Sequence, residues 1–339
     1  MILFVSGATG GHIYPAIAIA EAMKQPCFFV VPRHHPAQTI MAPYAFDYDV
    51  FKITIKDVLL IPIMWFKIFR LIYKKKPKVL ITMGGGICIP FAIVAWCLRI
   101  PVVSFEQNAI PGRATKGTQW FVKQIVTAFE SAKEGVFLKS KVRCLGNPVR
   151  VNYPDSDQLP KEWDTLNGKT LLVIGGSQGA LKINQFITQH KLDLMTLGFN
   201  VIHLTGAQFF DSGESYLIEK GNHATYIALR YLNNMNLAYE KASVVICRAG
   251  ATTLAELDQW QHPSILIPYP YAKDNHQFEN AKAFTSQHKS SVILNESEME
   301  ISTIQPFLTK LTYEKKYINQ AKEQEKMNSI CELMQSYLE

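Results

Sequence analysis

Four glycine-rich segments of the sequence carry residue types that could bind an anionic ligand. Each follows a short apolar run: Gly7-Ala8-Thr9-Gly10-Gly11-His12, Gly84-Gly85-Gly86, Gly175-Gly176-Ser177-Gln178-Gly179 and Arg248-Ala249-Gly250-Ala251-Thr252-Thr253. Glycine lets backbone amides approach a ligand closely, and a helix that begins just after the loop directs its positive end at that ligand. One such loop is often only a tight turn, but four in one chain indicate a nucleotide whose phosphates they hold.

The loops do not match the common nucleotide fingerprints. The dinucleotide pattern G-x-G-x-x-G fails at Thr9, and Gly168-Lys169-Thr170 precedes an expected strand where a P-loop would follow one. NAD and ATPase chemistry are therefore disfavoured. Asp47-Tyr48-Asp49 has the D-x-D spacing of some metal-dependent sugar transferases, yet it follows no clear strand. We expect neither a metal nor another cofactor.

Glu256 follows the fourth loop within the first turns of an expected helix. A carboxylate there can accept hydrogen bonds from both hydroxyls of a ribose. An acidic residue near a helix start is also favoured by the helix dipole alone. Both interpretations remain open at this point.

The elements that must position these loops alternate along the whole chain. The expected strands are Ile2–Val5, Phe28–Val31, Val79–Thr82, Val102–Phe105, Ile125–Ala128, Val142–Leu145, Thr170–Ile174, Val201–Leu204, Thr225–Ala228, Val244–Cys247 and Ile265–Pro268. Strands alternating with helices predict an α/β fold of parallel sheets, with ligands at the carboxyl ends of the strands. The polar stretch 151–169 predicts a linker between two domains. Both halves of the chain begin with an expected strand, a glycine turn and a helix.

Composition supports two domains with different partners. The 339 residues are 48% hydrophobic, which suits about two domains with full cores. The net charge is +12 over residues 1–150 and −5 over residues 151–339. A basic half attracts nucleic acid, anionic lipid or a phosphorylated substrate, and no nucleic-acid-binding module is recognised. The six cysteines form no C-x-x-C pair and the N-terminus has no signal-peptide pattern, so we expect a cytoplasmic protein with reduced thiols.

Two apolar stretches bear on the membrane. Residues 79–98 carry no charge, but glycines and Pro90 interrupt them, which favours a strand, a glycine turn and a buried helix over a membrane span. Residues 58–78 predict an amphipathic helix that is either a core helix with a solvated face or a membrane-docking helix. The docking interpretation uses Leu59, Ile63, Trp65, Phe66, Phe69, Lys74 and Lys75.

Six ordered motifs resemble the MurG family of glycosyltransferases, over nearly the whole chain. They are GATGGH at Gly7, FEQN at Phe105, GNPVR at Gly146, GGSQGA at Gly175, RAGATTLAE at Arg248 and KDNHQFENA at Lys273. The sequence departs from the family at Gly84–Pro90, which lacks the usual tyrosine, serine and late glycine, and at Phe105, which replaces a histidine.

The resemblance implies a GT-B fold, with two Rossmann-like doubly wound parallel-sheet domains and a cleft between them. Residues 1–150 would bind the acceptor and the membrane, residues 151–319 would bind the UDP-sugar, and the last helix, about 320–339, would pack back on the first domain. The implied reaction is inverting transfer of N-acetylglucosamine from UDP-N-acetylglucosamine to the C4 hydroxyl of undecaprenyl-diphospho-muramoylpentapeptide (lipid I), giving lipid II for peptidoglycan synthesis, cell shape and division. The enzyme would sit peripherally on the cytoplasmic face of the membrane, with a cell-wall synthesis complex as a further partner.

Site residues follow from the resemblance position by position. The donor would contact Arg150, Ser177, Gln178, Leu232, Ala251, Thr252, Thr253, Leu254, Ala255, Glu256, His276 and Gln277. Within this set the resemblance implies that Leu232 meets the uracil, Glu256 the ribose and 251–253 the diphosphate. It also implies that Gln277 and His276 meet the sugar hydroxyls. The acceptor side would comprise Thr9, Gly10, Gly11 and Asn108, which would also touch the donor sugar, and Asn108 would belong to the catalytic residues. His12 is the candidate general base because imidazole titrates near neutrality, although it could instead hydrogen-bond an acceptor phosphate. Glu106 is the alternative base.

Three other functions compete with this interpretation. Another lipid-directed GT-B glycosyltransferase would share the fold and the membrane surface. A UDP-N-acetylglucosamine epimerase would turn over the donor alone. A non-catalytic subunit that presents a membrane surface is disfavoured, because donor and acceptor loops occur in one chain.

Overall fold

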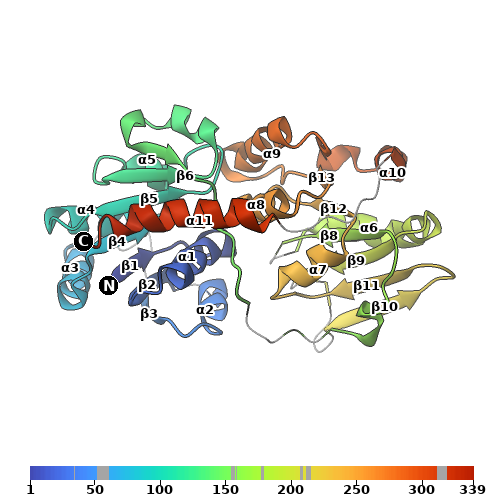
Figure 1. Ribbon diagram of the computed structural model, residues 1–339, viewed down its shortest axis with the longest axis horizontal. Coiled ribbons are helices and arrows are strands. Elements are labelled where there is room, and N and C mark those ends of the chain that lie inside the picture. Colours follow the sequence, from blue (N-terminus) through green and yellow to red (C-terminus); the bar gives the residue numbers. More distant parts are fainter. Residues whose placement is uncertain are drawn as a thin grey trace. The chain divides into compact units, whose positions relative to one another are not determined.

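The computed structural model describes residues 1–33, 35–51, 61–153, 157, 159–176, 179–206, 209–210, 215–310 and 319–339. Contacts among these residues divide the chain into two compact units. Met1–Asn152 together with Gln320–Glu339 forms the N-terminal unit, and Tyr153–Asn319 forms the C-terminal unit. Each unit is built around one sheet (Figure 1).

The sheet of the N-terminal unit is parallel throughout its described strands. Its order is β3 (Asp47–Phe51), β2 (Cys27–Pro32), β1 (Ile2–Val5), β4 (Val79–Thr82), β5 (Val102–Glu106), β6 (Gln124–Thr127) and β7 (Val142–Cys144). The helices of this unit are α1 (Gly10–Met23), α2 (His35–Met41), α3 (Ile61–Lys75), α4 (Cys88–Cys97), α5 (Arg113–Thr118) and α11 (Gln320–Gln335).

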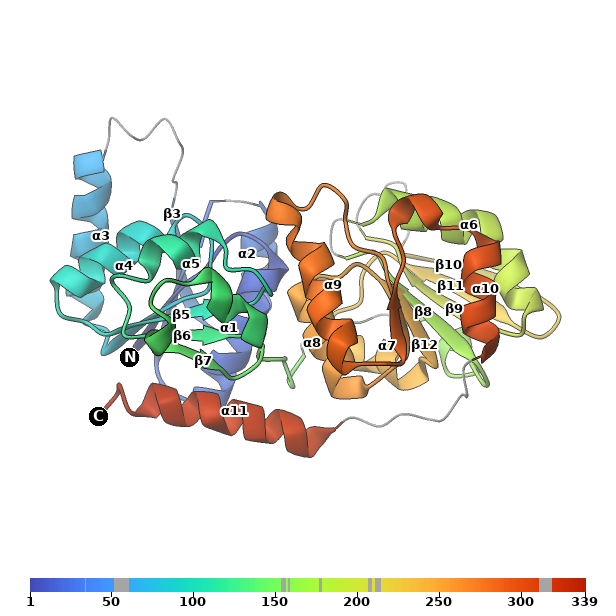
Figure 2. The ribbon, with the colours of Figure 1, turned by 90° about the horizontal axis from the view of Figure 1, so that it is seen from above.

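Two hydrophobic cores cover the two faces of this sheet. Along β1, Ile2 and Phe4 belong to a core with residues of α1, α2 and α11, whereas Leu3 and Val5 belong to a core with α3 and α4. Successive side chains of a strand point to opposite faces, so a strand with helices on both faces is apolar at every position. This explains the unbroken apolar run that opens the sequence. Figure 2 shows α3 and α11 on opposite sides of these strands.

The last helix, α11, belongs to the N-terminal unit. Its Ile330, Leu333 and Met334 are buried in the core that contains α1, and Figure 1 shows α11 running beside α1. Its Glu323 accepts a hydrogen bond from the backbone N–H of Val149 at 3.3 Å. This hydrogen bond joins the segment around Val149 to the C-terminal helix α11.

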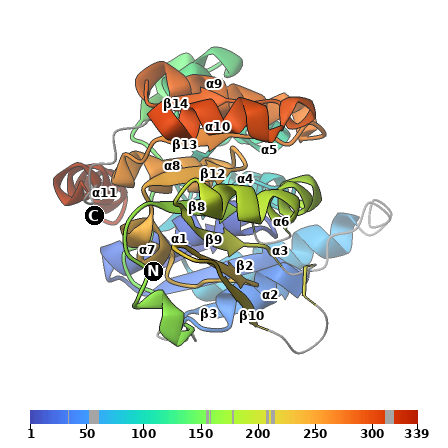
Figure 3. The ribbon, with the colours of Figure 1, turned by 90° about the vertical axis from the view of Figure 1, so that its right-hand side faces the viewer.

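The C-terminal unit repeats this plan with one antiparallel edge. Its order is β10 (Tyr216–Lys220), β11 (Thr225–Leu229), β9 (Asn200–Leu204), β8 (Thr170–Ile174), β12 (Val244–Cys247), β13 (Ser264–Leu266) and β14 (Ser291–Ile293), and β10 is antiparallel to β11. Its helices are α6 (Leu181–Thr196), α7 (Met235–Lys241), α8 (Ala251–Trp260), α9 (His276–Gln287) and α10 (Ile301–Lys310) (Figure 3). Apolar residues of α6 and α10 share one core with the strands.

Most predicted strands are confirmed, but three edge strands escaped prediction. The sequence analysis did not assign β3, β10 or β14, and they lie at the edges of the two sheets. An edge strand faces solvent on one side and needs no continuous apolar run, so its pattern is weak. Asp47 and Asp49, with their D-x-D spacing, lie in β3 itself.

The apolar stretch 79–98 folds as predicted. It forms β4, a glycine turn and α4, whose Phe91 and Ala92 are fully buried. Within the described part of the chain, none of the helices has both the length and the apolar character that crossing a membrane requires.

All six cysteines are free thiols. Cys88 and Cys247 are buried as expected, whereas Cys97 is exposed. Burial raises the pKa of Cys88 to about 12 and raises the pKa of Cys247 above its usual range. The thiols of these two residues are thus protonated and unreactive at neutral pH.

Candidate functional site

The first glycine loop encloses the ring of His12. Thr9 is the N-cap of α1, and Gly10, Gly11 and His12 form the first turn of the helix. A Cβ atom at Gly7 would lie 2.5 Å from Cδ2 of His12, and one at Gly84 would lie 2.8 Å from Cε1. Glycine at both positions therefore makes room for the imidazole, and this requirement links the first and second loops.

Glu106 is surrounded by hydrogen-bond donors. Oε1 accepts from the backbone N–H of Asn108 at 3.0 Å and from its Nδ2 at 3.2 Å. Oε2 accepts from the N–H of Gly112 at 2.8 Å and from Oγ1 of Thr115 at 2.6 Å. The side chain is only 5% exposed. Because both oxygens already have donors, this geometry favours a carboxylate that holds the loop after β5 over one that removes a proton from substrate.

The second glycine loop, which departs from the family pattern, is held by a thiol. Cys88 donates from Sγ to the carbonyl oxygens of Gly84 at 3.0 Å and of Val5 at 3.3 Å. These bonds connect the loop to the end of β1, beside the first glycine loop. Gly84 and Gly85 have φ angles of 90° and 91°, which glycine adopts without strain.

Arg150 lies inside the N-terminal unit. Its guanidinium carbon is 3.7 Å from the ring centroid of Tyr14, and its Nη1 donates to the hydroxyl of Tyr44 at 2.6 Å. The residue is 6% exposed. Burial raises the pKa of the nearby Glu21, and the positive charge of Arg150 opposes that shift. Arg150 thus has partners in its own unit, and its contact with a nucleotide stays a prediction.

In the C-terminal unit, the loop after β8 approaches the end of β9. Gly176 and Gly179 both have φ near 82°, and a Cβ atom at Gly179 would lie 2.6 Å from the carbonyl oxygen of Thr205. This close approach requires glycine. Ser177 and Gln178, the predicted donor contacts of this loop, lie outside the described residues.

The fourth loop leads into the N-terminus of α8, where Gly250 is the N-cap. Ala251, Thr252 and Thr253 form the first turn, at the positive end of the helix dipole. Among the described residues, the buried hydroxyl Oγ1 of Thr252 has no hydrogen-bond partner. A buried polar atom without a partner is costly, so this hydroxyl together with the helix N-terminus fits an anionic ligand.

Glu256 lies further along α8, beyond Leu254 and Ala255, and is 8% exposed. The hydroxyl of Tyr239 donates to its Oε2 at 2.9 Å. Burial, and then the neighbouring Glu256, raise the pKa of Tyr239 well above its usual range, so the tyrosine remains a donor. Tyr239 therefore orients the carboxylate that the resemblance assigns to the ribose.

The turn that contains Leu232 is anchored by an acid from the predicted linker. The backbone N–H groups of Asn233 and Asn234 donate to Oδ1 and Oδ2 of Asp157 at 2.8 and 2.7 Å. Asn234 then caps α7 by accepting from the N–H of Asn236 at 3.2 Å. Leu232 itself is buried, at 3% exposure. These bonds fix the backbone that would contact the uracil.

The segment before α9 has an unusual backbone. Asp274 and Asn275 have φ angles of 54° and 52°, and such conformations persist where the surroundings enforce them, often at functional sites. Nδ1 of His276 lies 2.7 Å from the carbonyl oxygen of Lys273, and Oε1 of Gln277 accepts from the N–H of Tyr269 at 2.9 Å. The predicted sugar-binding side chains are thus held by their own loop.

The loop before α8 is joined to α9 by one contact and, through Arg248, to the segments that follow β13 and β14. Nδ2 of the fully buried Asn280 donates to the carbonyl oxygen of Ala249 at 3.2 Å. Arg248 forms an ion pair with Glu296 and donates to the carbonyl oxygens of Ile267 and Pro268. The predicted diphosphate and sugar segments therefore form one connected substructure.

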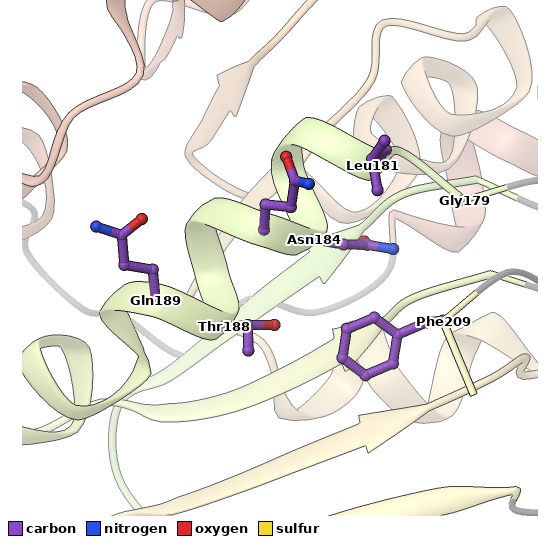
Figure 4. A pocket seen from close by; sticks show the side chains of 7 residues that line it. Gly179, Leu181, Asn184, Thr188, Gln189 and Phe209 are labelled. Atoms are coloured by element: carbon purple, nitrogen blue, oxygen red, sulfur yellow. The ribbon is translucent and has the colours of Figure 1, made fainter. Parts of the chain in front are cut away.

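A pocket of about 460 Å³ lies along α6 in the C-terminal unit. Figure 4 shows Asn184 and Thr188 projecting from α6 toward Phe209. The amide of Asn184 already donates to the carbonyl oxygen of Thr205 at 2.8 Å and contacts His203, whose pKa is lowered by burial to about 3. None of the predicted site residues that the structure describes lines this pocket.

An exposed apolar stripe runs along α3. Ile63, Phe66, Phe69 and Tyr73 are between 43% and 66% exposed, and Phe69 stacks on Tyr73 with ring centroids 5.8 Å apart. Lys67, Arg70 and Lys74 are exposed on the same helix. The opposite face of α3 buries Ile68 and Ile72 completely.

Two residues of the predicted docking surface also contact the rest of the unit. Trp65 is half-buried against the core that contains α4, and Nζ of Lys75 lies 3.6 Å from the ring centroid of Phe28. Both are partly buried, and their part in docking stays a prediction. Leu59 lies outside the described residues. Trp96 on the neighbouring α4 is 55% exposed and adds an aromatic side chain that the prediction missed.

Four residues that the sequence analysis missed contact or position predicted site residues. Gln107 and Asn280 lie inside the motifs FEQN and KDNHQFENA, so the motifs could have indicated them. Asp157 lies in the polar linker and Tyr239 lies on another helix than Glu256, and no local pattern marks either. Among the described residues, no group of three His, Cys, Asp or Glu side chains could hold a metal ion.

Comparison with known proteins identifies the family. Residues 2–127 match the glycosyltransferase family 28 N-terminal domain, and residues 170–336 match the family 28 C-terminal domain. A protein of Myxococcus xanthus is 32% identical over 88% of this chain and 81% of its own length. It is named UDP-N-acetylglucosamine–N-acetylmuramyl-(pentapeptide) pyrophosphoryl-undecaprenol N-acetylglucosamine transferase.

Solved structures share the fold. The crystal structure of Acinetobacter baumannii MurG has a TM-score of 0.69 at 22% identity and covers 99% of both chains. The UDP-GlcNAc 2-epimerase of Methanocaldococcus jannaschii has a TM-score of 0.66 at 12% identity, covering 98% of this chain and 99% of that one. The two parallel-sheet units thus have the GT-B fold, and the sequence matches show that the chain belongs to glycosyltransferase family 28 and within it to the MurG family of N-acetylglucosamine transferases.

Proposed function

We propose that this chain transfers N-acetylglucosamine from UDP-N-acetylglucosamine to the C4 hydroxyl of undecaprenyl-diphospho-muramoylpentapeptide, giving lipid II with inversion at the anomeric carbon. The observation that carries the proposal is the 32% identity over 88% of the chain to a transferase of that name. The N-terminal unit would bind the acceptor and the C-terminal unit the donor.

The donor side of the proposal rests on α8 and the segments joined to it. The N-terminus of α8 and the buried hydroxyl of Thr252 would receive the diphosphate and stabilise it as it leaves. Glu256, oriented by Tyr239, would accept hydrogen bonds from the ribose. His276 and Gln277 would contact the sugar hydroxyls. These groups provide for the leaving diphosphate without a metal ion or cofactor.

The acceptor side of the proposal rests on the first loop. His12 would take the proton from the attacking hydroxyl while Thr9, Gly10, Gly11 and Asn108 line the site. The proton passes to the imidazole, the new glycosidic bond forms, and UDP departs with the electrons of the broken bond. Protonated His12 then returns its proton to solvent.

One assay tests the proposed reaction. The chain is incubated with UDP-N-acetylglucosamine and lipid-linked muramoylpentapeptide, and we expect the disaccharide lipid to form, also in the presence of a chelator. The donor incubated alone should remain unchanged. Conversion of the donor alone would identify an epimerase. A strict need for Mn²⁺ would contradict metal-free transfer and would support a metal site at Asp47 and Asp49.

We expect Thr252→Val to weaken UDP binding at least about tenfold, because a hydrogen bond to a charged group contributes about 1.5–3 kcal/mol. The stability of the free protein should stay equal or rise, because the hydroxyl has no partner before UDP binds. Calorimetry with UDP and a thermal melt without it measure both effects.

Thr82→Val is the matched control for this prediction. The Oγ1 of Thr82 is likewise buried without a partner, but it lies in β4 of the other unit. We expect this variant to show the same effect on stability and unchanged UDP binding. Equal UDP affinities for Thr252→Val and the wild-type protein would contradict the assignment of the diphosphate to α8.

We also propose that the chain docks peripherally on the cytoplasmic face of the membrane through α3. The support is the exposed stripe of Ile63, Phe66, Phe69 and Tyr73, interleaved with basic residues of the same helix. Apolar and basic side chains together bind the interface of an anionic bilayer. Exposed Trp96 on α4 extends this surface.

Vesicle sedimentation tests the docking surface. Replacing Lys67, Arg70 and Lys74 by Glu should weaken binding to anionic vesicles more than about tenfold, because each basic residue near such a surface contributes about 1 kcal/mol. Binding should fall further in high salt. The same charge change at exposed Lys282, Lys289 and Lys310 of the C-terminal unit is the control. If both triple variants sediment alike, α3 is not the docking helix.

A further inference from the structure

Gln107 contacts the ring of His12 from the neighbouring loop. Its Oε1 lies 3.3 Å from Nδ1 of His12, 95 residues away in sequence. The side chain of Gln107 is 3% exposed, and its buried Nε2 has no hydrogen-bond partner among the residues that the structure describes. A buried amide nitrogen without a partner is destabilising, so a glutamine at this position needs a physical explanation.

The chemistry of the two groups supplies that explanation. An amide oxygen can only accept, so the Nδ1 that faces it carries the hydrogen. A neutral imidazole has one N–H, and its Nε2 then holds the lone pair that can take up a proton. We propose that Gln107 is a positioning residue that keeps His12 in the Nδ1–H form and thereby makes Nε2 the basic atom. This inference rests on the proposed function, in which His12 is the base.

The surrounding structure holds both partners in place. The imidazole lies against Gly7 and Gly84, because a Cβ atom at either position would already touch the ring. The same Cβ at Gly84 would lie 3.6 Å from Oε1 of Gln107. On the other side, the Glu106 carboxylate fixes the backbone after Gln107 through Asn108 and Gly112. The imidazole and the amide therefore meet in one defined geometry.

Nitrogen NMR of the histidine rings tests the tautomer directly, without substrate. The protein is labelled with ¹⁵N-histidine, and the signals of His12 are assigned by their loss in His12→Gln. We expect a protonated Nδ1 and an unprotonated Nε2 in the wild-type protein at a pH where the ring is neutral. Gln107→Leu should reduce that preference and Gln107→Glu should keep it. A protonated Nε2 in the wild-type protein would overturn the proposal, as would a tautomer that Gln107→Leu leaves unchanged.

Kinetics give the second measurement. Gln107→Leu should lower kcat about tenfold, because the loss of one hydrogen bond in the transition state corresponds to about that factor in rate. The KM of both substrates should stay unchanged. Gln107→Glu should restore most of the rate, because its carboxylate also accepts from Nδ1. An equal loss in both variants would refute positioning through this acceptor.

Gln119→Leu is the matched control. Gln119 is 1% exposed in the same unit, and its Oε1 accepts from the N–H groups of Phe137 and Leu138. This variant should lose stability while the His12 signals and kcat stay the same. If the wild-type protein makes no disaccharide lipid, the proposed function fails, whereas the NMR result still decides the tautomer.

Discussion

The His12→Ala variant should transfer N-acetylglucosamine about 10²- to 10⁴-fold more slowly than the wild-type protein, the usual contribution of a general base. UDP affinity measured by calorimetry should stay the same, because His12 and the α8 loop belong to different units. Single-turnover rates at saturating substrates isolate the chemical step. His12→Gln fills the space between Gly7 and Gly84 better than alanine and should lose as much activity, because an amide accepts no proton.

The pattern of kcat and KM separates the two roles that His12 could have. A histidine that only holds an acceptor phosphate would raise the KM for the lipid and leave kcat nearly intact. A general base would lower kcat at saturation. His190→Ala, which removes a surface histidine paired with Asp193, controls for the loss of an imidazole and should change neither constant. Normal turnover of His12→Ala would refute the base assignment.

The Glu106→Gln variant should be less stable and less active at the same time. The amide can no longer accept from all four donors that surround the carboxylate, and each charge-assisted hydrogen bond contributes about 1.5–3 kcal/mol. The expected loss of one such bond corresponds to a fall in Tm of roughly 3–12 °C for a unit of this size. Thermal melts and kcat are measured on the same preparation. Activity should fall because the loop carrying Gln107 and Asn108 loses its anchor.

The alternative role of Glu106 predicts a different combination. A general base replaced by its amide would lose kcat while the melting temperature stayed the same. Glu323→Gln is the matched control, because Glu323 is also a buried carboxylate of the N-terminal unit, with donors from Val149 and Lys326. It should lose stability with little change in kcat. An unshifted melt for Glu106→Gln would restore Glu106 as a candidate base.

The fold could be predicted largely from local patterns. Strands that are buried on both faces read as unbroken apolar runs, and β1, β4, β8 and β12 are such strands. The edge strands could not be predicted in the same way, because β3 and β10 expose consecutive residues, which point to both faces of the sheet, and therefore lack that run. The inward direction of Trp65 also needed the structure, since helical period alone does not say which face meets the core.

The candidate site could be predicted where motif and element coincide. The glycine loops at Gly7 and Gly250 do precede helices, as the sequence indicates. The partners of the site residues could not be found in this way, because they come from distant segments. Asp157 reaches the turn at Asn233 from the linker, and Tyr239 reaches Glu256 from α7.

The sequence by itself determined the two α/β halves, their glycine loops and the resemblance to a glycosyltransferase family. These features depend on residue spacing along the chain, since periodicity and turn chemistry are local. Only the tertiary structure decided that Glu106 is enclosed by donors and that Gln107 faces His12. The contact of Gln107 with His12 joins the ends of β1 and β5, strands whose order in the sheet differs from their order in the sequence. Hydrogen bonding depends on distance and direction in space, which residue spacing does not contain.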